Sequence, residues 1–202
     1  MLRWKGCPAD ESGNITVASV FMAVVIAFAL AAVLDFGCAF AQHAKQEAAL
    51  AVALDSTSTS ATGLMVKNSD SPERDLAFQV VTALRRNGCG DAVTVYVKEA
   101  TAKQVGDDSH RALAVYVEVS GTYHPMSAGK LIGDMEVASS DGCYLVPYSA
   151  DAAWRPSPWP CKATSEATSD PSFIHCSCQS TASMPEQVDN LLSAAIEDIK
   201  GK

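Results

Sequence analysis

The sequence predicts an α+β protein with a long N-terminal transmembrane helix that continues as a stalk. After it we expect a small antiparallel sheet with one packed helix, a Cys/Pro-rich loop and a C-terminal amphipathic helix. Three observations predict this class. Residues 14–34 contain no charged residue, proline or glycine. Two later segments alternate apolar and polar residues as strands do, and two others repeat their apolar residues at helical spacing.

The uncharged stretch Asn14–Leu34 has 21 residues, and a helix needs about 20 residues to cross a bilayer core. A signal-peptide core is usually about 7–15 residues long, so we expect a retained membrane span. Two alternatives stay open. Residues 39–41, Ala-Phe-Ala, have the small-x-small form of a signal-peptidase site with cleavage near Ala41, and Cys38 after a glycine resembles a lipidation site.

Charges and cysteines predict the orientation of this span. Arg3 and Lys5 precede it, and basic residues favour the cytoplasmic side. The large acidic domain and six of the seven cysteines follow it, which suits an oxidising compartment. We therefore predict a cell-membrane protein with a single span, a cytoplasmic N-terminus and an extracytoplasmic C-terminal domain.

The helix-favouring composition continues past the outer membrane edge. Residues 35–55 contain seven alanines, one glycine and no proline. A single helix over residues 14–54 is roughly 60 Å long, about twice the thickness of the lipid interior. Small residues let helices approach closely. The outer half can therefore pack beside other stems or on the protein's own domain, and both interpretations stay open.

The rest of the chain divides by composition and periodicity. Residues 92–98 and 113–120 predict an antiparallel pair of strands, residues 132–138 a third strand and residues 144–146 a fourth. Pro72 begins a helix that ends at Asn87. The predicted segments are a leader (1–13), a transmembrane helix and stalk (14–54), a linker (55–71), an α+β extracytoplasmic domain (72–149), the Cys/Pro-rich loop (150–184) and the C-terminal helix (185–202).

The four prolines within residues 150–184 argue against regular structure there. A loop of this length usually has a function or is held by covalent cross-links. We expect disulfides to be these cross-links, although the pairing does not follow from the sequence. The candidate disulfide cysteines are Cys89, Cys143, Cys161, Cys176 and Cys178. The last two are too close together for a structural zinc site, so we predict no metal and no cofactor.

Charge and motifs exclude several classes of function. The net charge of −8 argues against a nucleic-acid partner. The sequence contains no nucleophile elbow, phosphate-binding loop, zinc-protease motif or dinucleotide-binding fingerprint. None of the histidines, at positions 43, 110, 124 and 175, belongs to a recognisable catalytic arrangement. We therefore predict no catalytic residue and a protein that is not an enzyme.

The N-terminal residues resemble a known family. Gly13 and Asn14 open the hydrophobic stretch, Asp35-Phe36-Gly37 follows its outer end, and an alanine-rich run covers residues 46–51. This order resembles the TadE/TadG-like proteins, which are pseudopilin-type components of the bacterial tight-adherence (Flp) pilus system. The resemblance covers residues 12–54 best.

The resemblance implies that a prepilin peptidase cuts between Gly13 and Asn14. It also implies a membrane environment, other pilin-like or pilus-assembly subunits as partners, and a role as a minor or accessory component of pilus assembly. The chain differs from the family at Ala18, where glutamate is common, so an uncut anchor is an alternative. The alternative function is a membrane-tethered, disulfide-rich extracellular binding module that uses the Cys/Pro-rich loop.

Overall fold

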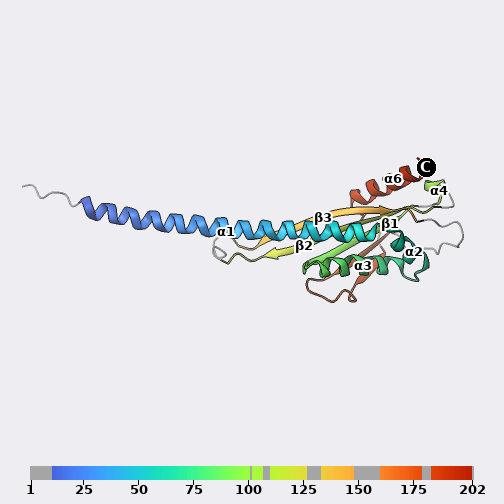
Figure 1. Cartoon of the computed structure of the whole chain (residues 1–202), viewed down its shortest axis with the longest axis horizontal. Coiled ribbons are helices and arrows are strands. Elements are labelled where there is room, and N and C mark those ends of the chain that lie inside the picture. The colour runs from blue at the N-terminus through green and yellow to red at the C-terminus, as the bar shows by residue number, and fades with distance from the viewer. Residues whose placement is uncertain are drawn as a thin grey trace, which may run out of the picture.

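The computed structural model describes residues 11–100, 102–106, 110–126, 133–147, 160–178 and 183–201. It confirms the α+β class: a long helix protrudes from an elongated body built on one antiparallel sheet (Figure 1). Only part of the long helix contacts this body. Its outer half lies along the strands, and its N-terminal half extends away from them.

The long helix α1 spans Glu11–Thr57 and has 47 residues. It is about 70 Å long at 1.5 Å per residue. It begins three residues before and ends three residues after the predicted segment 14–54. The outer half packs on the protein's own domain, where Ala49, Leu50 and Ala53 are buried. Packing on the domain, one of the two interpretations above, is therefore what the structure shows for this half.

The segment predicted as a linker, residues 55–71, is instead largely helical. Helix α1 runs to Thr57, and helix α2 covers Ser60–Asn68. Thr59 caps α2, because its side-chain oxygen accepts a hydrogen bond from the Thr62 backbone N–H at 3.4 Å. A threonine of the predicted linker therefore supplies a helix cap, and Val66 anchors α2 in the core.

The sheet has five antiparallel strands in the order β3-β2-β1-β4-β5. Strands β1 (Ala92–Glu99) and β2 (Leu113–Tyr123) form the predicted pair, with Val95 opposite Val117. Strand β3 (Met135–Leu145) joins the predicted third and fourth strands into one. Its pairing with β2 continues through the polar residues 139–142. Because these residues interrupt the apolar pattern, the sequence predicted two strands instead of one.

The prediction of an irregular loop over residues 150–184 is wrong for two segments. Strands β4 (Cys161–Ser165) and β5 (His175–Cys178) extend the sheet beside β1. Pro160 and Pro171 lie outside these strands, so neither removes a donor from the ladder. Residues 150–159 and 179–182 of the predicted loop lie outside the described residues.

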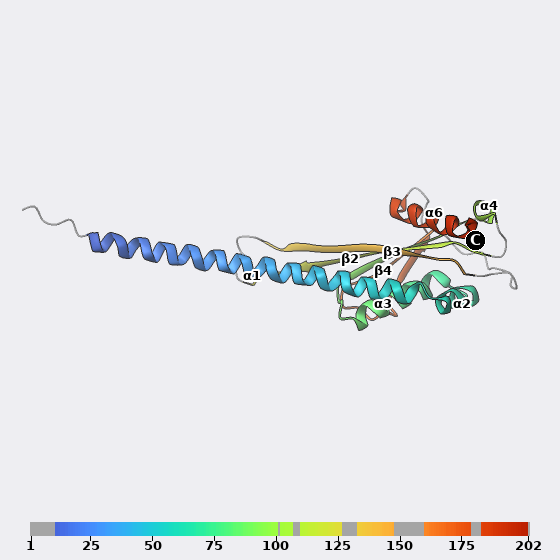
Figure 2. The same ribbon diagram turned by 45° about the horizontal axis from the view of Figure 1, so that its top comes forward.

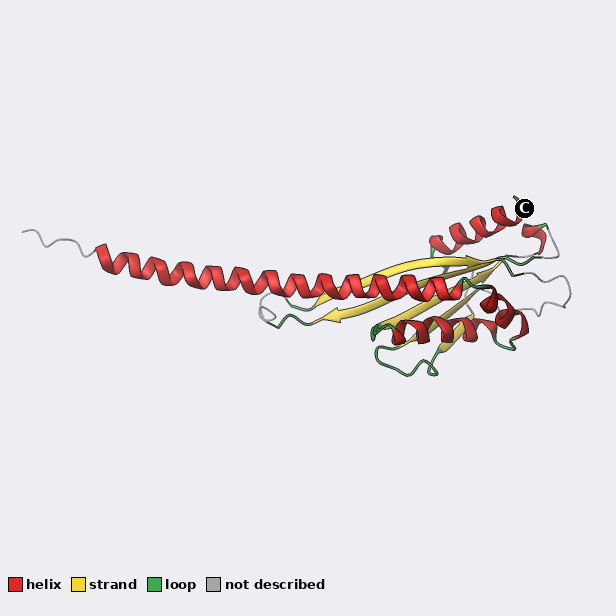
Figure 3. Ribbon diagram, viewed as in Figure 1, coloured by secondary structure: helices red, strands yellow, loops and turns green. Residues whose placement is uncertain are grey.

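Helices cover both faces of the sheet (Figures 2 and 3). On one face, α1 and α3 (Pro72–Arg86) pack on the inward residues of β1 and β2, including Val95 and Val115. On the other face, α6 (Glu186–Lys200) packs on Tyr96, Tyr116 and Ala114. A short helix, α4 (Ala102–Val105), follows β1. The predicted helices 72–87 and 185–202 are thus confirmed, and each buries its apolar stripe.

The α6 face of the sheet contains a tyrosine whose ionisation is coupled to folding. The Tyr96 hydroxyl donates to Glu118 Oε2 at 3.2 Å, and its ring centroid lies 6.2 Å from that of Tyr116. Desolvation by burial, followed by the Glu118 charge, raises the pKa of Tyr96 from 10.0 to about 12. The neutral phenol is therefore the form that the fold favours.

We expect Tyr96 to make the protein less stable in alkali. A raised folded-state pKa contributes stability that is complete below pH 10 and is lost as the pH rises toward about 12. The Tyr96→Phe variant should lose less stability than the parent over this window. Denaturant unfolding of the full chain in detergent micelles at pH 8 to 11 measures this. The Tyr144→Phe variant, at a residue 37% exposed, is the control. Parallel curves for parent and Tyr96→Phe would contradict the expectation.

Candidate functional site

The N-terminal half of α1 presents apolar side chains on all sides. From Val17 to Leu34 its large apolar residues are 45–70% exposed. By length and composition, α1 is the one helix among the described residues that could cross a membrane. Such a continuous apolar surface is far larger than a water-soluble monomer normally exposes. We name residues 16–34 the apolar stem.

Asp35 marks the point where the free half of α1 becomes the packed half. Its side chain is only 2% exposed although it follows the apolar stem directly. The Tyr123 hydroxyl donates to Asp35 Oδ1 at 3.4 Å, and the Met126 backbone N–H donates to the same oxygen at 3.1 Å. The end of β2 therefore satisfies a carboxylate that would be costly to bury without partners.

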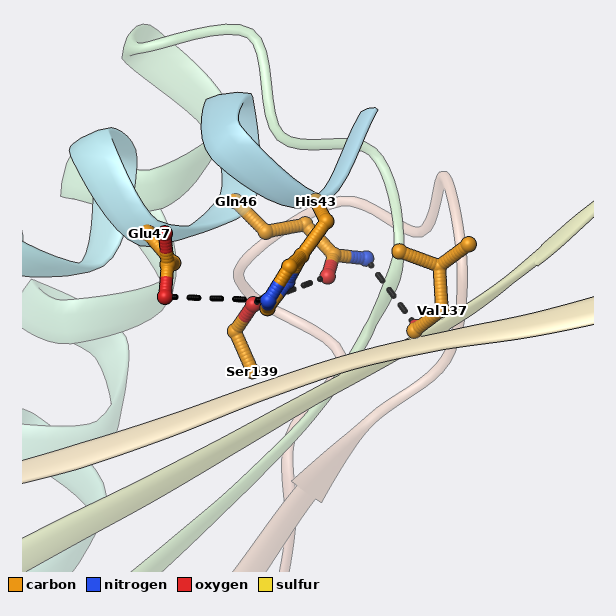
Figure 4. Close-up of polar contacts among 5 residues, drawn as sticks. All are labelled: His43, Gln46, Glu47, Val137 and Ser139. Atoms are coloured by element: carbon orange, nitrogen blue, oxygen red, sulfur yellow. Dashed lines mark hydrogen bonds and ion pairs between the residues drawn. The ribbon is translucent and has the colours of Figure 1, made fainter. Parts of the chain in front are cut away.

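A cluster of polar side chains joins the outer half of α1 to the sheet. We name Gln42, His43, Gln46, Asp91 and Ser139 the polar junction. Gln46 lies at its centre and is 1% exposed. Its Nε2 donates to Asp91 Oδ2 at 2.8 Å and to the Val137 carbonyl oxygen at 3.3 Å, and its Oε1 accepts from Ser139 Oγ at 3.2 Å (Figure 4 shows the β3 contacts).

The geometry around Asp91 requires a glycine on the neighbouring strand. Asp91 precedes β1 and accepts a second hydrogen bond from Gln42 Nε2 at 3.4 Å. Gly121 of β2 lies against its carboxylate, so that a Cβ at this position would overlap the carboxylate atoms. The absence of a side chain at Gly121 thus leaves room for Asp91 to reach α1.

Ser139, His43 and Glu47 lie in the order of a hydrolase triad, but their hydrogen bonds do not activate a nucleophile. His43 Nδ1 lies 2.8 Å from Ser139 Oγ, and His43 Nε2 lies 3.7 Å from Glu47 Oε1 (Figure 4). The Ser139 hydroxyl donates its one proton to Gln46. Because this bond uses the one Ser139 proton, Ser139 accepts from His43 when His43 carries a proton on Nδ1, and that arrangement is the reverse of the general-base role.

The structure places the predicted site residues in separate regions. Gly13 and Asn14 lie in the first turns of α1. Cys89 follows α3, Cys143 lies on β3, and Cys161, Cys176 and Cys178 lie on β4 and β5. Among the described side chains, Cys38, Cys89, Cys143 and Cys176 are free thiols. These four cysteines therefore give no support to the expectation of a domain cross-linked by disulfides. No group of metal-binding side chains occurs among the described residues.

Burial raises the pKa of three of these thiols. For Cys176 the cause is desolvation, followed by the charge of Glu73. Desolvation raises the pKa of Cys143 from 9.0 to about 12, with the nearby Asp141 charge as a second cause. Desolvation also raises the pKa of Cys89, which is 3% exposed. Since the thiolate is the reactive form, Cys143 and Cys89 behave as small apolar core residues.

Sequence reasoning missed the polar junction because its members are far apart along the chain. His43 and Ser139 are separated by 96 positions, and Gln46 and Asp91 by 45. The one local signal was a group of polar residues on a single side of an alanine-rich helix. No family model matches the chain, and no curated protein or solved structure matches it.

We expect the Gln46→Met substitution to weaken the attachment of α1 to the sheet. The change keeps the length of the side chain but removes the hydrogen bonds that Gln46 makes with Asp91, Ser139 and the Val137 carbonyl. The loss of unfolding free energy should be about 1–3 kcal/mol. Chemical denaturation of the full chain in detergent micelles measures it.

Gln42→Met is the matched control for this change. Gln42 is half-buried and makes one long hydrogen bond to the same aspartate. Its loss should stay within about 0.5 kcal/mol. Equal losses for the two variants would show that the polar junction does not depend on Gln46.

Proposed function

We propose that this chain is a single-pass envelope protein that acts in the assembly of a tight-adherence pilus, as a minor pseudopilin-like or accessory component. One observation carries the proposal. Helix α1 is continuous from Glu11 to Thr57, its first half is apolar and exposed, and its second half is packed on an antiparallel sheet. This division suits a subunit that anchors by one half of a helix and presents a domain on the other.

The apolar stem needs a lipid or protein environment. Its large apolar side chains are exposed, and contact with water is unfavourable in proportion to their apolar area. A membrane covers such a helix in the isolated subunit. Neighbouring stems cover it in an assembly, where the alanines allow close packing. Lipid thus covers the stem before assembly, and neighbouring stems cover it afterwards.

An apolar strip continues past Asp35 and supports contact with another subunit. Phe36 is 57% exposed and Phe40 is 72% exposed. Beside them lies a groove of about 540 Å³ between α1 and the edge strand β3. Its lining includes Ala39, Val137 and Ala138. Because this strip extends the surface of the apolar stem onto the domain, we expect it to contact a neighbouring subunit.

The polar junction serves this function by making the stem and the domain one rigid unit. Gln46 fixes α1 to β3 and to Asp91. Asp35 accepts from Tyr123 at the end of β2 and from the backbone of Met126 beyond it. A stem that packs in an assembly therefore sets the orientation of its domain. We propose no catalytic residue.

N-terminal sequencing of the protein isolated from its native membrane tests the proposal. A start at Asn14 supports processing by a prepilin peptidase, and a start at Met1 supports an uncut anchor. A start at Gln42 would overturn the proposal, because the apolar stem would be missing from the mature protein.

Photo-crosslinking tests the assembly step. A photoreactive residue in place of Phe40 should crosslink to pilus subunits or to a second copy of the chain. The same residue in place of Glu47, whose side chain is 64% exposed, is the control. Crosslinks to lipid alone at position 40 would support a membrane anchor and would contradict the assembly role.

A further inference from the structure

Strands β4 and β5 bring two cysteines into register at the far edge of the sheet. In their antiparallel pairing Cys161 is directly opposite Cys178, and Ala163 is opposite Cys176. Strand β5 is the outermost strand and has four residues. Such a short edge strand has few ladder bonds to hold it.

The backbone geometry of this pair fits a disulfide. Directly opposite residues of an antiparallel pair have Cα atoms about 4.5–5.5 Å apart, and disulfides bridge Cα atoms about 4.4–6.8 Å apart. Diagonal neighbours are about 7–8 Å apart, which places Cys176 beyond the usual reach of Cys161. The register therefore selects Cys178 over Cys176.

The position of Cys161 agrees with this selection. Its side chain is 2% exposed, and its Sγ donates to the carbonyl oxygen of Ser177 at 3.4 Å. Ser177 immediately precedes Cys178. The sulfur of Cys161 is thus directed at the end of β5 that carries the second cysteine.

The other described cysteines are poorly placed to compete. Cys143 lies on β3, which is three strand positions from β4, or roughly 14 Å at 4.8 Å per strand. Cys89 lies beyond α3, with its thiol directed at Asp91 Oδ2 at 3.8 Å. Cys38 lies on α1, which packs on β3 rather than on β4.

We propose that Cys161 and Cys178 form an intramolecular disulfide that closes β5 onto β4. The oxidant is a reactive disulfide, either of a thiol-oxidising protein or of oxidised glutathione. One thiolate attacks the oxidant, forms a mixed disulfide and releases a thiol. The second thiolate then attacks the mixed disulfide, forms the Cys161–Cys178 bond and releases a second thiol. The two protein thiols lose two hydrogens, and the oxidant's disulfide becomes two thiols. In the cell, this inference rests on the proposed extracytoplasmic position of the domain.

Peptide mapping of the oxidised full chain tests the pairing. The detergent-solubilised protein is equilibrated with oxidised and reduced glutathione, alkylated, and digested with trypsin without reduction. Trypsin cleaves after Lys162 and so separates Cys161 from both β5 cysteines. It does not cleave the Arg155–Pro156 bond, so Cys143 and Cys161 share one peptide, and Cys176 and Cys178 share the other. We expect a linked pair in which each peptide carries one alkylated cysteine and whose mass is lower by two hydrogens than the sum of these two peptides. Fragmentation should place the alkyl groups on Cys143 and Cys176. Alkylated Cys161 in the parent protein would overturn the proposal.

Two matched variants identify the partner of Cys161. Cys176→Ser should keep the linked peptides, and Cys178→Ser should lose them. Linked peptides in Cys178→Ser, or their loss in Cys176→Ser with Cys178 alkylated, would overturn the pairing. Circular dichroism of both variants checks the fold, and the parent protein provides the decisive result if either variant misfolds.

Alkylation in intact cells separates this inference from the proposed function. Trapping the thiols before lysis should find Cys161 and Cys178 already linked. If the pair links in the glutathione buffer but is alkylated in cells, the pairing is correct and the proposed extracytoplasmic position fails. If the pair is free in both experiments, the disulfide proposal fails and the pilus proposal is unaffected.

Discussion

Replacing Val25 with arginine should release the protein from the membrane. Val25 lies at the middle of the apolar stem and is 45% exposed. Moving arginine to the centre of a bilayer-spanning helix costs about 3 kcal/mol more than valine. This corresponds to roughly a 100-fold change in the insertion equilibrium. We therefore expect most of the variant to be extracted from membranes by alkaline carbonate, where the parent stays in the pellet.

Val25→Leu is the control for this experiment, because it keeps the apolar surface and should behave as the parent does. The domain should stay folded in both variants, since the apolar stem lies outside the sheet and its two cores. Extraction of the parent and of the leucine variant by alkaline carbonate would show that the apolar stem is not a membrane span. The pilus proposal would then lose its anchor.

Replacing Leu50 with alanine should cause the largest loss of stability among single changes in the outer half of α1. Leu50 is 2% exposed and belongs to the core between α1, α3 and the sheet. A buried leucine truncated to alanine costs about 2–5 kcal/mol, because transfer free energy is lost and a cavity is left. Guanidinium unfolding of the full chain in micelles, followed by far-ultraviolet circular dichroism, measures the change.

Val52→Ala is the control on the same helix. Val52 is 52% exposed and faces away from the core, so its truncation should change stability by less than about 0.5 kcal/mol. The contrast tests whether this half of α1 is part of the domain. If Leu50→Ala were as mild as Val52→Ala, the outer half of α1 would be a free stalk, and the rigid coupling of stem to domain would fail.

The elements predicted correctly are those whose burial pattern is local. The stem has a continuous apolar run, β1 and β2 alternate with period two, and α3 and α6 repeat their apolar residues at helical spacing. The strands and the two helices show their periodicity in neighbouring residues, and the stem shows an uninterrupted apolar run. Such local patterns can be recognised in the sequence without knowing which segments pack together in the fold.

The elements predicted wrongly depend on distant partners. Strand β3 continues through Ser139 and Gly142 because β2 supplies its ladder bonds and because Ser139 meets Gln46. Strands β4 and β5 are short and lie between prolines. Strand β1 offers the edge on which β4 forms, and β4 offers the edge for β5. Helix α2 forms within the predicted linker 55–71, because its Val66 enters the core.

The amino-acid sequence by itself determined the apolar stem, the α+β class and the helices and strands with strong periodicity. Only the tertiary structure decided that the outer half of α1 lies on the sheet, that Gln46, Asp91 and Ser139 meet there, and that Cys161 faces Cys178 across two strands. The physical reason is the range of the interactions. Secondary-structure preference acts between neighbours in the chain, whereas a buried polar contact or a strand register exists only after segments tens of residues apart have packed together.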